Sequence, residues 1–160
     1  MPLTVGEQAP DFELPLKPGE APLRLSDYRG EKPVVLLFFP LAFSPACSKE
    51  FSTLANGYGE WKELDAEIIG ISVDSPFVTQ KFAQEVGAQF PIVSDFNKTV
   101  TDAYGVRCQD FFGLEGVANR SCFVLDRDGK VVYSWMSEDS GVMPDFGAIR
   151  DAVREADEQA

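Results

Sequence analysis

The apolar residues of this chain occur in short runs that predict buried strands. Residues 34–39 are six consecutive apolar residues that end at Pro40, and residues 66–74 contain a second apolar run. Unbroken runs of Val, Leu, Ile and Phe are typical of strands that a sheet buries on both faces. Residues 1–33 differ, because Pro and Gly recur there, and they predict short extended pieces separated by turns.

A helix is predicted after each of these two strands. Ser44 followed by Pro45 is a typical helix start, because serine is a favoured N-cap and proline is tolerated in the first helical position. Residues 45–64 then place apolar side chains at helical spacing, with two glycines that are expected to bend or loosen the helix. The same start signal recurs at Ser75, and Gly87 is the expected end of that second helix.

The second half of the chain predicts a strand, a helix, a hairpin and a final helix. Residues 90–95 predict a short strand, after which Asp95 can cap a helix that runs to about Tyr104. Residues 121–135 predict two strands joined by a tight turn, and a terminal helix is expected from about Pro144. Strands that alternate with helices and end in a hairpin indicate an α/β fold with a central mixed sheet flanked by helices.

Composition limits what such a fold could bind. The length predicts one domain, 1–160, that can bury a core of its own. A formal net charge of −12 disfavours nucleic acid, because phosphate contacts need clustered Lys and Arg. No signal-peptide pattern and no stretch of roughly 20 apolar residues is visible, so we expect a cytoplasmic protein that does not bind membranes. The cysteines are few and odd in number, which predicts reduced thiols.

Missing residue types exclude several kinds of catalysis. The chain contains no histidine, which excludes Ser-His-Asp and Cys-His nucleophile pairs, HExxH zinc sites and CxxCH haem sites. Its three cysteines are spaced too irregularly for a zinc knuckle, and no GxGxxG or P-loop motif is present. We therefore expect neither a metal nor an organic cofactor.

One cysteine stands at a position suited to chemistry. Cys47 falls in the first turn of the helix after the first buried strand, on the same stripe as Phe51, which faces the core. Ligand sites of open α/β sheets lie at the carboxyl ends of strands, and this strand ends at Pro40. Free N–H groups at a helix start stabilise a thiolate, which would make Cys47 a nucleophile at neutral pH. The alternative is that Cys47 is an ordinary buried side chain.

Ser44 leaves a similar choice open. As an N-cap, its oxygen would accept a hydrogen bond from the N–H of residue 46 or 47, which stabilises a helix by about 1 kcal/mol. A hydroxyl can accept one hydrogen bond and donate another, so capping does not exclude a catalytic role.

The segment PLAFSPAC matches the active-site pattern of a known family. Its Pro40, Ser44 and Cys47 follow the peroxiredoxin pattern P-x-x-x-T/S-x-x-C, and the likeness extends to VGEQAPDFEL, LLFFPLAF, FPIVSD, AYGV and GVANRSCFVLDRDG. The chain resembles the peroxiredoxins, and is most like the AhpE-type one-cysteine members. This resemblance implies a thioredoxin-like fold with an N-terminal extension. It also implies a thiol-dependent peroxidase that reduces hydrogen peroxide and organic hydroperoxides.

The resemblance implies a role for each matching residue. Cys47 would be the peroxidatic nucleophile that attacks the O–O bond and becomes a sulfenic acid. Pro40 would shield Cys47 from solvent, and Ser44 would hydrogen-bond the peroxide. Arg120, in NRSCFVLD, would face the thiolate, although its residue type alone would not distinguish it among the seven arginines. Glu50, one turn after Cys47, is a candidate for orienting Arg120.

A monothiol thioredoxin-fold exchange factor, or a binding module without activity, is the alternative function. The segment SPAC is a C-x-x-C frame in which Ser44 replaces the first cysteine, so the dithiol exchange of thioredoxins is disfavoured. Peroxide reactivity would separate these functions, because only a peroxidase consumes hydroperoxide far faster than free cysteine does.

We expect a one-cysteine mechanism in which an external thiol reduces the oxidised Cys47. Position 52, where one subgroup of the family keeps a resolving cysteine, is Ser52, and Cys122 is expected to be buried in a strand. Cys108 lies in a loop and is the remaining candidate for a resolving cysteine. The resemblance further implies a homodimer that associates through the edge near the active site. The preferred peroxide stays open, as does the reductant, which could be thioredoxin, a glutaredoxin-like protein or a small thiol.

Overall fold

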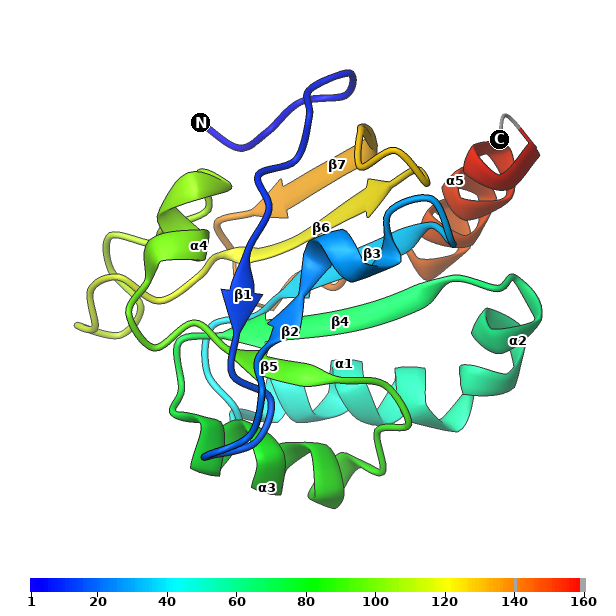
Figure 1. Cartoon of the computed structure of the whole chain (residues 1–160). Helices are drawn as coiled ribbons and strands as arrows, with labels where there is room; N and C mark the ends of the chain where they lie inside the picture. Colours follow the sequence, from blue (N-terminus) through cyan, green and yellow to red (C-terminus); the bar gives the residue numbers. More distant parts are fainter. Residues whose placement is uncertain (140, 159–160) are drawn as a thin grey trace.

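A mixed sheet forms the centre of the protein. The computed structural model describes residues 1–139 and 141–158, and in this part of the chain the sheet has five strands. Their bounds are Val34–Phe38 (β3), Glu67–Ser72 (β4), Ile92–Ser94 (β5), Arg120–Leu125 (β6) and Val131–Ser137 (β7). They lie in the spatial order β5-β4-β3-β6-β7 (Figure 1). The β3–β4 and β4–β5 pairs are parallel, whereas β3–β6 and β6–β7 are antiparallel.

The central position of β3 explains its unbroken apolar sequence. All of its residues are buried, and Phe38 lies opposite Ile71 of β4 on one side and Ser121 of β6 on the other. A strand with neighbours on both edges and covered faces has no solvent-facing side for polar residues. The predicted doubly buried strand and the predicted mixed sheet are therefore confirmed.

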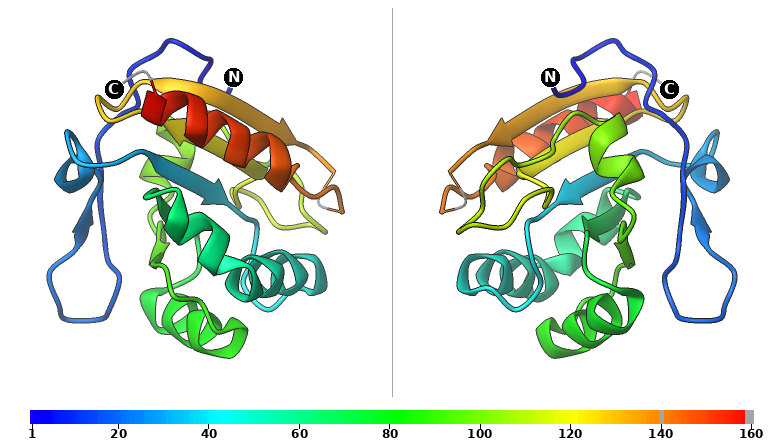
Figure 2. Two further views of the ribbon diagram at one scale, coloured as in Figure 1. Left: turned by 90° about the vertical axis from the view of Figure 1, so that its right-hand side faces the viewer. Right: turned by 90° about the vertical axis from the view of Figure 1, so that its left-hand side faces the viewer.

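Helices and an N-terminal segment cover the two faces of this sheet. The helices are Pro45–Asn56 (α1), Tyr58–Glu63 (α2), Pro76–Val86 (α3), Thr99–Ala103 (α4) and Phe146–Glu158 (α5). The N-terminal segment forms a small hairpin, Glu13–Leu14 (β1) with Leu23–Arg24 (β2), and a 3-10 turn, Leu25–Tyr28 (η1). Figure 2 shows α1 on one side of the sheet and the N-terminal hairpin on the other.

Alternation along β3 divides the core into two layers. Leu36 and Phe38 point toward the N-terminal segment and α4, where they pack with Phe12 and Tyr104. The intervening side chains, such as Leu37, point to the opposite face and pack with residues of α1, α3 and α5: Phe51, Leu54, Phe82, Ile149 and Val153. The second layer is the one that contains Cys47.

Helix starts and ends agree with the sequence at several points and differ at two. Ser75 caps α3, since its oxygen accepts a hydrogen bond from the Val78 N–H at 3.4 Å, and Gly87 ends that helix in the left-handed conformation. The predicted helix over 45–64 is instead divided at Gly57 into α1 and α2. The helix expected directly after Asp95 begins only at Thr99, because the carboxylate of Asp95 accepts from N–H groups further along the chain, at Val100 and Thr101.

A glycine in β4 allows α1 to approach the sheet closely. A Cβ atom on Gly70 would lie 2.8 Å from Cε1 of Phe51, a side chain of α1. The close approach of Phe51 to β4 leaves no room for a side chain at position 70. Because Cys47 lies one turn before Phe51, this contact also sets the depth at which the cysteine sits.

None of the helices in the described part of the chain combines the length and the apolar character that crossing a bilayer requires.

Candidate active site

Cys47 lies in the first turn of α1, directly after the carboxyl end of β3. Its side chain is 0% exposed, and Pro40, which follows β3, is also buried. Proline occupies the first position of α1, as predicted, and the Ser48 N–H donates to the Ser44 carbonyl at 2.9 Å. The thiol therefore sits at the positive end of a helix, beneath the loop that joins β3 to α1.

Arg120, on β6, contacts the sulfur of Cys47, and Glu50, on α1, contacts Arg120. Arg120 is the first residue of β6, where the pairing of Ser121 with Phe38 brings it beside the end of β3. Its Nη2 donates a hydrogen bond to Cys47 Sγ at 3.2 Å, and its Nη1 donates to Glu50 Oε1 at 2.5 Å. Glu50 lies one turn after Cys47 on α1. The guanidinium thus bridges the thiol and the carboxyl group.

Burial governs the charges of this group. Glu50 and Arg120 are each only 1% exposed. Burial raises the pKa of Glu50 from 4.5 to about 7, although the adjacent Arg120 acts in the opposite direction. Burial by itself would lower the pKa of Arg120, but the charges of Glu50 and Cys47 outweigh it, so that pKa rises and the guanidinium stays protonated. The second carboxyl oxygen of Glu50 is buried without a hydrogen-bond partner among the described residues.

The hydroxyl of Ser44 does not make the predicted capping bond. Ser44 is the N-cap residue of α1, yet its oxygen accepts nothing from the helix, and its hydroxyl donates to the Leu41 carbonyl at 3.0 Å. Its backbone carbonyl still accepts the first helical hydrogen bond. Because the proton of the hydroxyl is used locally, the lone pairs of the oxygen remain available to accept a hydrogen bond.

An aspartate that the sequence did not single out holds the loop between β3 and α1. Asp74 Oδ2 accepts from the Ala42 N–H at 2.7 Å and from the Ser72 hydroxyl at 2.8 Å. Phe43, next in the loop, adopts a left-handed φ of 69°, which is unusual for a bulky residue. Its position in the chain could have indicated this role. Asp74 follows β4, and the carboxyl ends of neighbouring parallel strands lie at one end of a sheet.

A cavity of about 140 Å³ reaches Arg120, the residue that contacts Cys47 and Glu50. Pro40 and Arg120 line it together with Phe111 and Phe112, from the loop that precedes β6. A cavity of this size suits a small ligand rather than a large cofactor.

The other two cysteines differ in position. Cys108 is half-buried and lines the same cavity as Pro40 and Arg120. Among the described residues, no hydrogen bond joins Cys108 to Cys47, whose sulfur accepts from Arg120. Cys122 is fully buried in β6, as predicted, and burial raises the pKa of its thiol well above the ordinary value. A buried, protonated thiol is a poor nucleophile.

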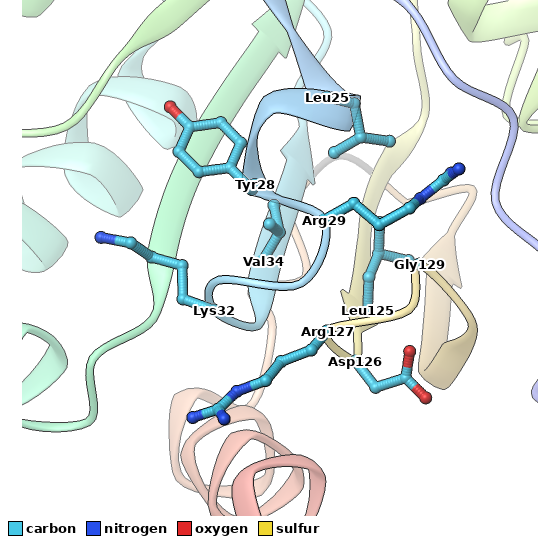
Figure 3. A pocket seen from close by; sticks show the side chains of 9 residues that line it. All are labelled: Leu25, Tyr28, Arg29, Lys32, Val34, Leu125, Asp126, Arg127 and Gly129. Carbon is cyan, nitrogen blue, oxygen red and sulfur yellow. The ribbon is translucent and has the colours of Figure 1, made fainter. Parts of the chain in front are cut away.

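A second, smaller cavity lies at the opposite ends of β3 and β6. It is lined by Val34 and Leu125, which pair with each other, and by basic residues. Figure 3 shows that Arg29, Lys32 and Arg127 direct their charged groups away from one another. They do not form a cradle for an anion.

Comparisons with known proteins show the family of the chain. The family model described as AhpC/TSA family matches residues 5–134. Alkyl hydroperoxide reductase E of Mycobacterium tuberculosis is 38% identical over 138 residues, which cover 85% of this chain and 87% of that protein. The chloroplastic 2-cysteine peroxiredoxin of Chattonella marina var. antiqua is 34% identical over 143 residues, which cover 84% of this chain and 71% of that protein.

Solved structures give the same result. The crystal structure of peroxidoxin BcpB from Mycobacterium tuberculosis has a TM-score of 0.80 and 33% sequence identity, and the match covers 98% of this chain and 97% of that chain. The predicted thioredoxin-like peroxiredoxin fold is thereby confirmed, and an exchange factor or an inactive binding module is not favoured. The chain belongs to the AhpC/TSA family of peroxiredoxins and is a thiol-dependent peroxidase.

Proposed function

We propose that Cys47 is the peroxidatic cysteine of this enzyme and that Arg120, Ser44 and Pro40 complete its active site. The observation that carries this proposal is the hydrogen bond from Arg120 Nη2 to Cys47 Sγ at 3.2 Å. A buried cation beside a thiol at a helix start favours the thiolate, which is the reactive form.

In the reaction, the thiolate attacks the terminal oxygen of a hydroperoxide. An S–O bond forms and the O–O bond breaks as an electron pair moves from sulfur to the leaving oxygen. The leaving alkoxide, or hydroxide, takes a proton from solvent, and Cys47 becomes a sulfenic acid. Arg120 and the N–H groups of the first turn stabilise the charge that moves onto the leaving oxygen, a contribution of about 3 kcal/mol for each well-placed donor.

Ser44, Pro40 and Glu50 act on the geometry of this step. The Ser44 hydroxyl donates to Leu41, so its lone pairs are available to accept a hydrogen bond from the O–H of the peroxide. Pro40 is buried beside the cavity and limits the access of water to the sulfur. Glu50 orients Arg120 through the 2.5 Å contact with Nη1.

An external thiol completes the cycle. The thiol attacks the sulfenic sulfur, which forms a mixed disulfide and releases water, and a second thiol then displaces Cys47 as a free thiol. Two observations support this one-cysteine route: residue 52 is serine, and Cys122 is buried with a raised pKa. Cys108 lines the cavity and is the remaining candidate for an internal resolving thiol. The reductant would be thioredoxin, a glutaredoxin-like protein or a small thiol in a reducing compartment such as the cytoplasm.

Homodimerisation through the end of the sheet that carries Cys47 is part of the proposal. Among the described residues, the exposed large apolar side chains other than Met1 and Val5 all lie at this end of the sheet. Each follows β3, β4, β5 or β7, or precedes β6: Phe43, Phe77, Phe96, Phe112, Leu114 and Val142. Exposed apolar groups gathered at one end are typical of an association surface. Sedimentation of the reduced protein tests this, and a monomer mass at all concentrations would contradict it.

The catalytic proposal is tested by rapid-quench reaction of the reduced protein with one equivalent of hydroperoxide. Sulfenic acid should be trapped within seconds and located on the peptide that contains Cys47. Cys47→Ser should abolish the adduct, while Cys122→Ser, which removes a buried thiol, should retain it. An unmodified Cys47 in the wild type would refute the proposed nucleophile.

A further inference from the structure

The cavity lined by Arg120 adjoins a wider hollow. This hollow, of about 390 Å³, shares Cys108, Asp110, Asn119 and Glu138 with the inner cavity. Because they share these residues, the two spaces are neighbours, and together they offer a route from solvent to the guanidinium that contacts Cys47. Any peroxide that follows this route passes the shared residues, which we call the mouth.

Along this route the arginines have acidic partners, whereas two carboxylates have no basic partner among the described residues. Arg120, at the inner end, faces the carboxyl group of Glu50 and the sulfur of Cys47. Arg107, in the outer hollow, pairs with Asp102 at 3.2 Å. Asp110 and Glu138 are exposed, and neither is in an ion pair within residues 1–139 and 141–158. The mouth thus carries two carboxylates whose charges are not compensated.

Two aromatic rings form part of the remaining lining, beside the uncharged polar residues Gln109, Asn119 and Ser137. The rings of Phe111 and Phe112 stack edge to face with their centroids 4.8 Å apart, and both line the inner cavity. Asp110 also holds this loop, because its Oδ1 accepts from the Gly113 N–H at 2.8 Å. The route therefore offers aromatic contact to an alkyl group and electrostatic repulsion to an anion.

We propose that Asp110 and Glu138 select the substrate by charge, so that the enzyme prefers uncharged alkyl hydroperoxides over hydroperoxides that carry a carboxylate. The proposal rests on Cys47 being the peroxidatic cysteine and adds a substrate class to it. The same repulsion acts on small anionic thiols that approach the sulfenic acid by this route.

The expected size of the effect follows from simple electrostatics. A carboxylate about 7 Å from an anion in water lowers the anion's local concentration by roughly two- to threefold at low ionic strength. Two carboxylates therefore give about a fivefold discrimination. Because the mouth is open to solvent, added salt should remove most of it.

The test uses a matched pair of probes: a short tertiary alkyl hydroperoxide with a terminal carboxylate, and its methyl ester. The second-order rate constant for sulfenic acid formation on Cys47 is measured for both probes, and the ratio of carboxylate to ester is compared between proteins. Asp110→Asn with Glu138→Gln should raise this ratio about fivefold at low ionic strength, and much less in 0.5 M salt. Asparagine keeps an oxygen for the Gly113 N–H, so the loop should hold its shape.

A control separates the mouth from the overall charge of the protein. Glu20→Gln with Glu31→Gln removes the same charge from exposed positions of the N-terminal segment and η1–β3 loop, and should leave the ratio unchanged. An equal rise in both double variants, or no rise in the first, would overturn the charge selection. Failure of wild-type Cys47 to react with the ester would instead refute the proposed nucleophile.

Discussion

The Nη2 of Arg120 donates a hydrogen bond to Cys47 Sγ at 3.2 Å, while Nη1 of the same guanidinium contacts Glu50 at 2.5 Å. Arg120 is the first residue of β6, whereas Cys47 and Glu50 lie in the first turns of α1. Arg120 and Cys47 are 73 positions apart in the chain. A planar group with several donors can hold both partners at once, whereas an ammonium group offers a single point of charge.

Arg120→Lys should therefore lower the rate of Cys47 oxidation by about 100-fold, since it keeps the charge but loses one well-placed donor. Stopped-flow kinetics with one hydroperoxide measures this rate. Arg24→Lys, an exposed arginine of β2 that pairs with Glu13, serves as the control and should react at the wild-type rate. A similar loss in both variants would argue against a specific role for Arg120.

The two Ser-Pro helix starts should respond differently to alanine. Ser75→Ala removes a capping bond and should lower the free energy of unfolding by about 1 kcal/mol without slowing peroxide reduction. Ser44→Ala removes no capping bond, but should slow peroxide reduction about tenfold, because the hydroxyl proposed to accept a hydrogen bond from the peroxide is lost. Ser44→Thr should restore the rate. Denaturant unfolding and stopped-flow kinetics on both alanine variants check this, and a full rate in Ser44→Ala would contradict it.

The buried carboxyl group of Glu50 should make stability depend on pH. Burial raises its pKa from 4.5 to about 7, so the folded state binds more protons than the unfolded chain between these values. Its contribution to the free energy of unfolding should therefore fall as pH rises through 7, by about 2.5 kcal/mol between pH 5 and pH 8. The chain has no histidine, which removes the side chains that ordinarily titrate in this range.

Glu50→Gln tests this dependence, since glutamine has the same shape and does not titrate. Urea unfolding of both proteins at pH 5 and pH 8 should show a smaller loss of stability in the variant. Equal losses in the two proteins would mean that another group is responsible.

Cys108 should take no part in recycling, even though it lines the cavity. Treatment with one equivalent of hydroperoxide, without added thiol, should leave sulfenic acid on Cys47 in equal yield in the wild type and in Cys108→Ser. Peptide mass analysis under non-reducing conditions measures this yield. A Cys47–Cys108 disulfide in the wild type would show that the enzyme resolves its own intermediate.

Local features of the chain were enough to predict the element order. The apolar run over 34–39, the Ser-Pro starts at Ser44 and Ser75, and the end at Gly87 depend on burial, capping and backbone preferences of neighbouring residues. Cys47 could be singled out in the same way, because its position at a helix start after a buried strand is a local property. The division of one predicted helix into α1 and α2 is a boundary effect at Gly57.

Contacts between distant segments were decided by the tertiary structure. Arg120 was identified only by family resemblance, since nothing local distinguishes it from the exposed arginines, and its burial arises because β6 pairs with β3. The direction of the Ser44 hydroxyl and the support from Asp74 depend on loop geometry that the sequence pattern does not encode. The carboxylates of the mouth come from two separate loops, which adjoin only because the strand order brings both loops to the end of β3. Sequence periodicity therefore determined which elements form and where Cys47 lies, while strand pairing determined which charged groups surround its sulfur.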